Sequence, residues 1–429
     1  DDVAARVAAE ADEVTGAEAV RRAAAQAADR VEAEGGPWAR WKQRTTHGAP
    51  LFPLGVLFGL NMVDELDRAA FGVLLPEIRD HFGLDTSGVL TVVSLSMIAA
   101  LLLALPIGFY ADRWKRVPIA TAGASVWGFF SLLSGLAPNL WVLGSARAGA
   151  GLGRAVNDPV HNSLLADYYD IPARPRVYAV HRYANALGQF LGPLSAGLIA
   201  YAMGWRAPFV VFAVVTAVFV LLSLRLREPV RGRFERRAMG AGDDVARTEE
   251  DAPSWAESSR IVWQVRSLRR VYIALPFVAI AGLLTLGGLY SDEVFDLDER
   301  ARGFTAAGLE GAAQLVGLMF GIPLTSRLMA KGPGNVVRFL GTVSFGIAGA
   351  WILFALAPTL PLAIAANAVL SASFFLLIPG IFVTLSLAVP AKVRAFGYAV
   401  GTLFILPGLL LLPVIGWLAR QAGTLFIKR

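Results

Sequence analysis

The chain has 429 residues, of which 55% are hydrophobic and only 17% are charged, and its mean hydropathy is +0.56. Apolar stretches of ~20 residues recur along its whole length, which excludes an ordinary soluble protein and indicates that a lipid bilayer is the solvent. The net charge of +6 does not indicate nucleic-acid binding, because the basic residues lie in short loops between apolar stretches. The absence of cysteine excludes disulfides and thiol chemistry.

Residues 1–50 precede the first apolar stretch. Residues 1–36 are rich in alanine and acidic residues and predict a soluble helix with a thin apolar stripe. Such a helix is marginally stable alone, so we expect it either to dock on a partner or on a further domain, or to fray. Two tryptophans with basic neighbours follow at residues 38–44, a composition suited to the headgroup layer of membrane lipids. This region is therefore expected to be a cytoplasmic helix followed by an interfacial anchor.

The remaining apolar stretches predict eleven membrane helices in two bundles, residues 51–226 and 270–429, joined by a charged linker, residues 227–269. Phe82-Gly-Leu-Asp and Phe295-Asp-Leu-Asp follow the first helix of each bundle, as expected for parallel repeats. A twelfth helix is missing and the chain does not begin with methionine, so we expect a segment of a longer polypeptide. The predicted helices are 51–78, 88–111, 117–137, 140–168, 177–203, 207–225, 271–291, 304–330, 336–357, 360–389 and 394–420.

The distribution of lysine and arginine in the loops predicts the orientation. One set of loops carries most of them, and this side is expected to be cytoplasmic. The N-terminus and the linker then lie in the cytoplasm, and the protein is a multi-pass protein of a bacterial inner or plasma membrane. The basic loop residues on this side are Arg113, Lys115, Arg116, Arg174, Arg176, Arg327, Lys331, Arg338, Lys392 and Arg394.

The loop after the second predicted helix reads Gly-Phe-Tyr-Ala-Asp-Arg-Trp-Lys-Arg over residues 108–116. A glycine followed four and five residues later by Asp-Arg, and then by a basic pair, resembles the signature loop of the major facilitator superfamily. The resemblance implies an all-α major facilitator fold and secondary active transport by alternating access. The Asp-Arg pair in a membrane-side loop also suggests a conformational latch that holds the outward-facing state, with Asp112 capping the neighbouring half of its own bundle. The expected latch residues are Gly108, Asp112, Arg113, Arg116 and Asp167.

The fourth predicted helix contains Arg147-Ala-Gly-Ala-Gly-Leu-Gly-Arg-Ala, which resembles the helix-4 motif of the same superfamily, whose arginine is often tied to proton movement. Arg147, Arg154, Asp158 and His161 share one helix face, and Arg154 can pair with Asp158 four residues on. In the next helix, His181 and Arg182 are expected near the cytoplasmic end, in contact with solvent or headgroups.

The first predicted helix carries Asp64, Glu65, Asp67 and Arg68 within an apolar run. Charges inside a bilayer are costly unless they are paired or hydrated, so they indicate function. Residues 61–68 and 76–83 resemble the helix-1 pattern of Spinster-type lysolipid transporters, with Asp67 and Arg68 on that family's Asp-Arg pair. The alternative is that these charges lie at the outer end of a long helix. Because Arg154 stands where Spinster-like proteins carry glutamate, Asp158 or Asp64 is expected to bind the proton instead.

Helix depth predicts where these charges meet. At 1.5 Å per residue, Asp64 lies ~20 Å from the cytoplasmic start of its helix and Arg147 lies ~9 Å from the outer start of its own. In a ~30 Å hydrocarbon core these depths nearly coincide. Asp64, Asp67 and Arg68 are therefore predicted to approach Arg147.

The second bundle is poorer in charge, with Glu310 the only ionisable residue well inside it. One charged wall and one apolar wall predict an amphipathic substrate, such as a lysophospholipid or fatty acid, with its head held by Arg68, Arg147 and Arg154. The alternative is that nearby acids neutralise these arginines. Transport is expected to be proton-coupled, and the residues expected in substrate binding and coupling are Asp64, Asp67, Arg68, Arg147, Arg154, Asp158 and Glu310.

Other functions stay open. Gly192-Pro193 partly resembles the antiporter motif of drug/proton exchangers and favours an exporter of hydrophobic drugs. A lipid-modifying enzyme would need a nucleophile with a base, or a metal site, and no such spacing is found, so neither enzyme activity nor a cofactor is expected. A scaffold that uses residues 1–36, or a polypeptide that continues into an ATP-binding domain, would also fit, although this sequence has no nucleotide-binding loop.

Overall fold

The computed structural model describes residues 36–83, 103–242, 244–245, 253–281 and 311–410. The chain divides into two compact units, residues 1–52 and residues 53–429. The predicted helix within residues 1–36, Glu310, the predicted helix segments 88–102, 282–291, 304–310 and 411–420, and the place of a twelfth helix lie outside the described residues. In the first unit, helix α2 (Pro37–Thr46) has Trp38 and Trp41 stacked with ring centroids 4.9 Å apart.

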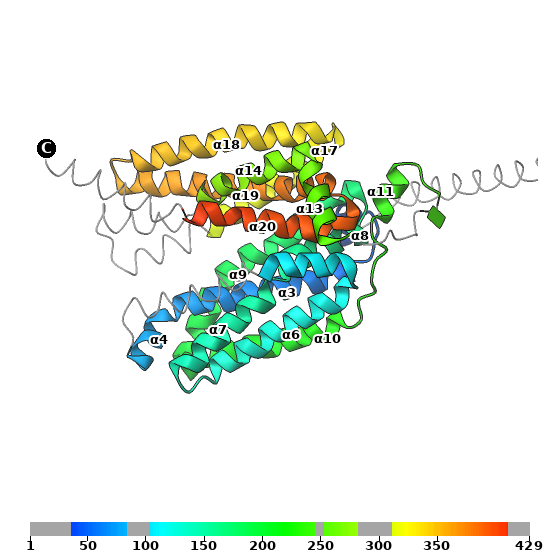
Figure 1. The fold of residues 1–429 in the computed structure, drawn as a ribbon. Helices are drawn as coiled ribbons and strands as arrows, with labels where there is room; N and C mark the ends of the chain where they lie inside the picture. Colours follow the sequence, from blue (N-terminus) through cyan, green and yellow to red (C-terminus); the bar gives the residue numbers. More distant parts are fainter. Residues whose placement is uncertain (1–35, 84–102, 243, 246–252, 282–310, 411–429) are drawn as a thin grey trace, which may run out of the picture. The chain divides into compact units, whose positions relative to one another are not determined.

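The first bundle is built from helices that mostly match the apolar stretches (Figure 1). Its core is a cluster of buried side chains that includes Val63, Trp127, Leu143 and Phe209. These side chains are close-packed, as in other protein interiors, and they hold the helices of the bundle together. The helices are α3 (Phe52–Val73), α4 (Leu75–Phe82), an unlabelled helix over 103–113, α6 (Arg116–Gly135), α7 (Leu140–Arg154), η1 (Asn157–His161), α8 (Asn162–Tyr168), α9 (Arg174–Met203) and α10 (Ala207–Ser223).

Two predicted helices are broken in the structure. The predicted helix 51–78 is divided into α3 and α4. Pro76 is the second residue of α4. The predicted helix 140–168 is divided into α7, the π-turn η1 and α8. Pro159 lies within η1 and has no backbone N–H to donate, so the regular hydrogen-bond ladder cannot pass through it.

One helix of each bundle begins in the same way. Short 3-10 turns, η2 (Ile171–Ala173) and η4 (Ala391–Val393), lead directly into α9 and α20, and a Pro-Ala pair occurs in or beside each turn. Tyr272, Leu385 and Phe396 are among the buried residues of one of its clusters. The described helices are α14 (Arg266–Ala281), α17 (Gly311–Ala330), α18 (Pro333–Ala355), α19 (Leu360–Ala388) and α20 (Arg394–Leu410).

The charged linker forms ordered structure between the bundles. It contains α11 (Arg233–Ala238) and α13 (Trp255–Gln264), and α14 begins earlier than predicted, at Arg266. The Trp255 ring lies against Phe109 of the first bundle and Phe396 of the second, with centroids 4.7 and 5.3 Å apart. The linker therefore contacts both bundles.

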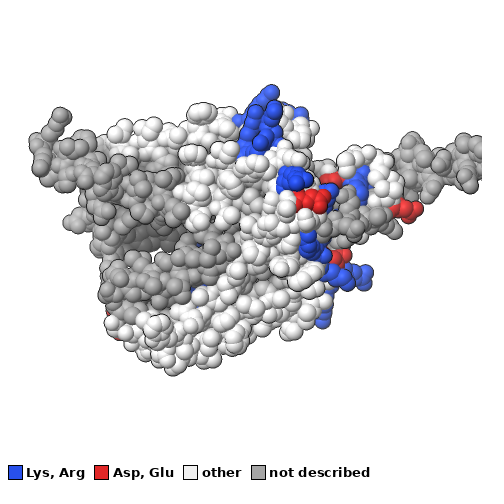
Figure 2. Space-filling view, in the orientation of Figure 1, with Lys and Arg blue, Asp and Glu red and all other residues white. Residues whose placement is uncertain are grey.

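Five of the described helices are long and apolar enough to cross a membrane. Many of their large apolar side chains are exposed, such as Phe129 on α6 and Phe345 on α18. On the face drawn in Figure 2, the visible charged side chains gather at one end, while most of the described flank is uncharged. This distribution is typical of helices that are surrounded by lipid.

Candidate transport site and basic-end network

A buried carboxylate, Asp67 on α3, is the centre of a charge cluster inside the first bundle. Its side chain is fully buried, and one oxygen lies 3.0 Å from Nη1 of Arg147, whose side chain is 1% exposed. Arg154 donates to the same oxygen, and Ser131 Oγ donates to the other oxygen at 2.5 Å. The Arg147 guanidinium also lies 4.3 Å from the centre of the Phe71 ring.

The cluster continues one helical turn along α3. Asp64 accepts hydrogen bonds from Arg154 Nε and from Asn157 Nδ2, the latter at 2.8 Å. We call Asp64, Asp67, Arg147 and Arg154 the core charge cluster. Two carboxylates from α3 and two guanidinium groups from α7 balance each other, as buried charges require.

A second ion pair lies beside this cluster and is more exposed. Arg68 Nη2 lies 2.5 Å from Glu65 Oε2, and the Arg68 side chain is 53% exposed. Glu65 also accepts from Asn185 Nδ2 on α9 at 2.9 Å, and Asn185 accepts from Asn61 at 2.8 Å. The Glu65–Arg68 pair is thus tied to α9.

The predicted approach of Asp67 to Arg147 is confirmed, and Asp64 joins them through Arg154. Arg68 pairs with Glu65 instead. The predicted Arg154–Asp158 pair is wrong, because the helix is irregular after Arg154, and Asp158 lies 2.6 Å from Arg182.

The expected exposure of His181 and Arg182 is also wrong. They are 1% and 9% exposed because α9 packs against the rest of the bundle there. Glu310 lies outside the described residues.

The signature loop lies at what we call the basic end, the end of the helices where residues 112–116 are found. Asp112 accepts hydrogen bonds from the backbone N–H groups of Ala395 at 2.9 Å and Phe396 at 2.7 Å. It therefore caps the first turn of α20, a helix of the second bundle, and not the neighbouring half of its own bundle as predicted. Gly108 lies so close to α20 that a Cβ there would come within 2.5 Å of Ala399 Cβ, so this position excludes any side chain.

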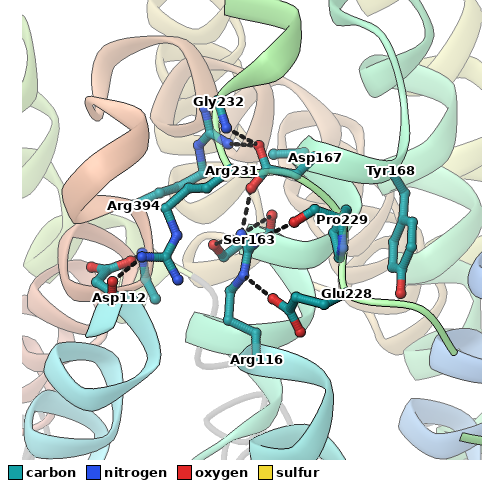
Figure 3. Close-up of polar contacts among 12 residues, drawn as sticks. Asp112, Arg116, Ser163, Asp167, Tyr168, Glu228, Pro229, Arg231, Gly232 and Arg394 are labelled. Atoms are coloured by element: carbon teal, nitrogen blue, oxygen red, sulfur yellow. Dashed lines mark hydrogen bonds and ion pairs between the residues drawn. The ribbon is translucent and has the colours of Figure 1, made fainter. Parts of the chain in front are cut away.

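Asp167 joins three parts of the chain at the basic end (Figure 3). It pairs with Arg116 of α6, accepts from Gly232 N in the linker at 2.9 Å, and accepts from Arg394 Nη1 of α20 at 2.7 Å. Asp167, Arg116 and Arg394 are fully buried side chains. Arg113 instead lies over the Phe109 ring at 3.7 Å and donates to the carbonyl of Pro253.

The linker supplies further members that the sequence did not predict as functional. Glu228 lies 3.0 Å from Arg116 Nε and also accepts from Val117 N at 2.8 Å. Arg231 donates to the carbonyl groups of Ala111 and Asp112. These contacts hold the linker on the signature loop.

Glu235 on α11 joins the first turns of α9 and α20. One carboxylate oxygen lies 2.7 Å from Arg174 Nη1 and also pairs with Arg394. Burial alone would raise the pKa of this carboxyl, but the guanidinium groups of Arg394 and Arg174 hold it below its ordinary value. A Pro-Ala pair precedes both Arg174 and Arg394 in the sequence. This shared pattern is the signal from which the equivalence of the two arginines could have been predicted.

Among the described residues, no three His, Asp or Glu side chains are placed to hold a metal ion. Gly192, which favoured a drug exporter, packs against α3, where an added Cβ would lie 2.8 Å from Ala69 Cβ. Close helix packing therefore accounts for this glycine.

Comparisons with known proteins place the chain in a family. The family model of the Major Facilitator Superfamily matches residues 57–413. A probable L-galactonate transporter of Escherichia coli is 26% identical over 258 residues, 59% of this chain and 56% of that protein. The human protein spinster homolog 1 is 28% identical over 192 residues, 43% of this chain and 36% of that protein. The matches thus span about half or less of these two relatives. A probable sulfoacetate transporter of Cupriavidus necator is 28% identical over 86% of this chain and 87% of its own length.

Solved structures share the fold. The fucose transporter FucP in its outward conformation has a TM-score of 0.67 at 14% identity and covers 86% of this chain and 92% of its own. A bacterial homolog of the lysosomal transporter Spinster has a TM-score of 0.54 at 19% identity, with 87% and 85% covered. The fold and the family match agree with the predicted all-α architecture. The chain therefore belongs to the Major Facilitator Superfamily, whose members are multi-pass membrane transporters and not enzymes, and within it resembles the Spinster-type proteins.

Proposed function

We propose that the protein is a proton-coupled secondary transporter that works by alternating access. The observation that carries this proposal is the core charge cluster, because charges inside a membrane bundle are costly and indicate function, and here two buried carboxylates hold two arginines. Arg154 pairs with both Asp64 and Asp67, so a proton on one of them removes one of the two charges that hold it. The guanidinium is then more available to an anionic ligand.

The preferred substrate class is an amphipathic lipid-like molecule with an anionic or zwitterionic head, such as a lysophospholipid or fatty acid. Arg147 is fully buried against Asp67, so it positions the carboxylate and does not touch the substrate. Arg68, with a side chain that is 53% exposed, and Arg154 are the residues proposed to hold the head. The apolar body is proposed to lie along α19, which carries Phe374 and Phe375.

The basic-end network is proposed to be the latch that closes the cytoplasmic side. It joins the first bundle, the linker and the second bundle through Asp112, Asp167 and Glu235. While these contacts are made, the two bundles cannot separate at this end. The basic end and the N-terminus are both proposed to lie in the cytoplasm of a bacterial cell, because most of the loop lysines and arginines are expected on that side.

A second candidate is transport of a small organic anion without a long apolar body. It is favoured by the probable sulfoacetate transporter, which matches this chain over 86% of its length. The same arginines would bind a carboxylate or sulfonate.

A binding experiment on the purified protein in lipid nanodiscs tests both candidates. Lysophospholipid, a fatty acid, sulfoacetate, a neutral sugar and a small cation are compared for binding. Arg68→Gln is expected to weaken lysophospholipid binding about tenfold or more, because a hydrogen bond to a charged group is worth ~1.5–3 kcal/mol. Arg338→Gln, at an exposed position in the second bundle, is the matched control. Preference for sulfoacetate would favour the second candidate, and preference for the sugar or the cation would contradict both.

A further inference from the structure

Two histidines, His161 of η1 and His181 of α9, form a buried pair that the core charge cluster does not include. Each residue is 1% exposed, and the ring centroids are 5.6 Å apart with an edge-to-face angle of 81°. Neither ring nitrogen of His161 makes a hydrogen bond with the described protein, whereas the His181 ring interacts with the backbone of Leu57. Buried polar groups in proteins are nearly always hydrogen-bonded, so an unpaired buried imidazole calls for an explanation beyond packing.

The local fold holds both rings in place. The π-turn around Pro159 carries His161, and π-turns within helices are frequently found at functional sites. The backbone carbonyl of His181 accepts from Asn61 Nδ2 at 3.3 Å, which ties this turn of α9 to α3. The backbone of Leu57 on α3 also faces the His181 ring.

An ion pair lies next to the histidines and extends to the second bundle. Arg182 lies 2.6 Å from Asp158 and 3.3 Å from Asn162 Oδ1. The same guanidinium stacks on the Phe382 ring of α19, 4.0 Å from its centre. Arg182 therefore contacts both Asp158 in the first bundle and Phe382 in the second bundle.

The other charged and titratable groups around the pair can be named by element. Asp64 and Glu65 come from α3 and are already bonded to Arg154, Asn157, Arg68 and Asn185. Tyr178 of α9 and Tyr398 of α20 lie with their hydroxyl oxygens 3.2 Å apart. Asp158 and Arg182 are thus the charges that respond most directly to a new charge on the histidines.

We propose that His161 and His181 together bind a proton besides the one proposed for Asp64 or Asp67, and that this proton drives the conformational change through the Asp158–Arg182 ion pair. The pair is uncharged in the closed arrangement seen here and takes up one proton when opening admits water. The imidazolium then attracts Asp158 and repels Arg182, so that Arg182 releases Asp158 and leaves the Phe382 ring. This inference rests on the proposed alternating access, but not on the identity of the substrate.

The composition of the chain allows a direct test. It has four histidines, of which His47 and His81 lie outside the pair, and no cysteine. Spin labels on Arg225→Cys and Val337→Cys, two exposed positions in different bundles, report the separation of the bundles as a function of pH, without any substrate. His47→Gln with His81→Gln is the control, and His161→Gln with His181→Gln is the test variant.

The control is expected to keep a sigmoidal pH dependence of the label distance between pH 5 and 8, near the ordinary histidine range, and the test variant is expected to lose it. An unchanged pH dependence in the test variant overturns the proposal.

Should that variant not fold, histidine-selective ¹⁵N spectra of the control protein report the native pair alone. Imidazole signals that titrate over this range support the proposal, and signals that stay fixed from pH 4.5 to 8.5 overturn it. Absence of lipid binding would contradict the proposed substrate and would leave this result standing.

Discussion

The Asp67 carboxylate is the acceptor for two arginines and a serine inside the first bundle. Its two oxygens accept from Arg147, Arg154 and Ser131. Both members of the Asp67–Arg147 pair are removed from solvent, so each depends on the other to offset its lost solvation. Removing one partner of such a pair is costly, whereas removing both can be nearly neutral. The structural role of Asp67 can be separated from its proposed role in transport on this basis.

Asp67→Asn is expected to destabilise the protein by ~3–5 kcal/mol, because Arg147 would be left buried without a counter-charge. The unfolding temperature in detergent measures this effect. Glu77→Gln, at an exposed position on α4, is the control and should leave the unfolding temperature unchanged. Adding Arg147→Gln to Asp67→Asn should restore most of the loss. If the double variant is less stable than the single one, the ion pair is not the source of the effect.

At the scale of the element, α11 is a short helix whose position depends on Glu235. The carboxylate binds the first turns of α9 and α20 through Arg174 and Arg394. Because the ion pairs lower the pKa of Glu235 in the folded protein below its ordinary value of 4.5, the carboxylate stabilises the fold most above pH 4.5. This contribution is lost as the pH falls below that value through the folded-state pKa.

Glu235→Gln should therefore release α11 at neutral pH, and acid should release it in the unchanged protein only below pH 4.5. Hydrogen exchange of the amides of residues 231–238 measures the release. Glu257→Gln on the neighbouring helix α13 is the matched control and should keep the slow exchange. Equal exchange in both variants would mean that α11 is held by other contacts.

The sequence predicts the membrane elements well because long apolar stretches report on the solvent directly. The predicted helices 117–137, 207–225 and 360–389 differ by at most two residues at either end from α6, α10 and α19. The break at Pro159 and the linker contacts could not be obtained in this way. Arg394 looks like an ordinary loop charge in the sequence, and only the tertiary structure places it beside Asp167 and Glu235.

For the whole molecule, the contacts at the basic end connect two bundles that each have their own buried core. Asp112 binds the first turn of α20, and Arg174 donates to Ser386 of α19 at 3.2 Å. Neither contact contributes to the core of its own bundle. They can therefore be weakened without unfolding either bundle, and the expected consequence is a shift between conformations.

Asp112→Asn is expected to shift the protein toward the form that is open at the basic end. The amide keeps one acceptor oxygen but loses the charge and the second acceptor for the N–H groups of Ala395 and Phe396. Loss of a helix cap costs ~0.5–2 kcal/mol, and one to two kcal/mol changes an equilibrium ~5–30-fold.

Since the chain has no native cysteine, Ser386→Cys gives a single thiol, buried between the bundles, whose labelling rate reports the opening. That rate should rise ~5–30-fold with Asp112→Asn and stay constant with Asp80→Asn, while lysophospholipid affinity changes little. A labelling rate that is the same with and without Asp112→Asn would show that the cap on α20 does not hold the bundles together.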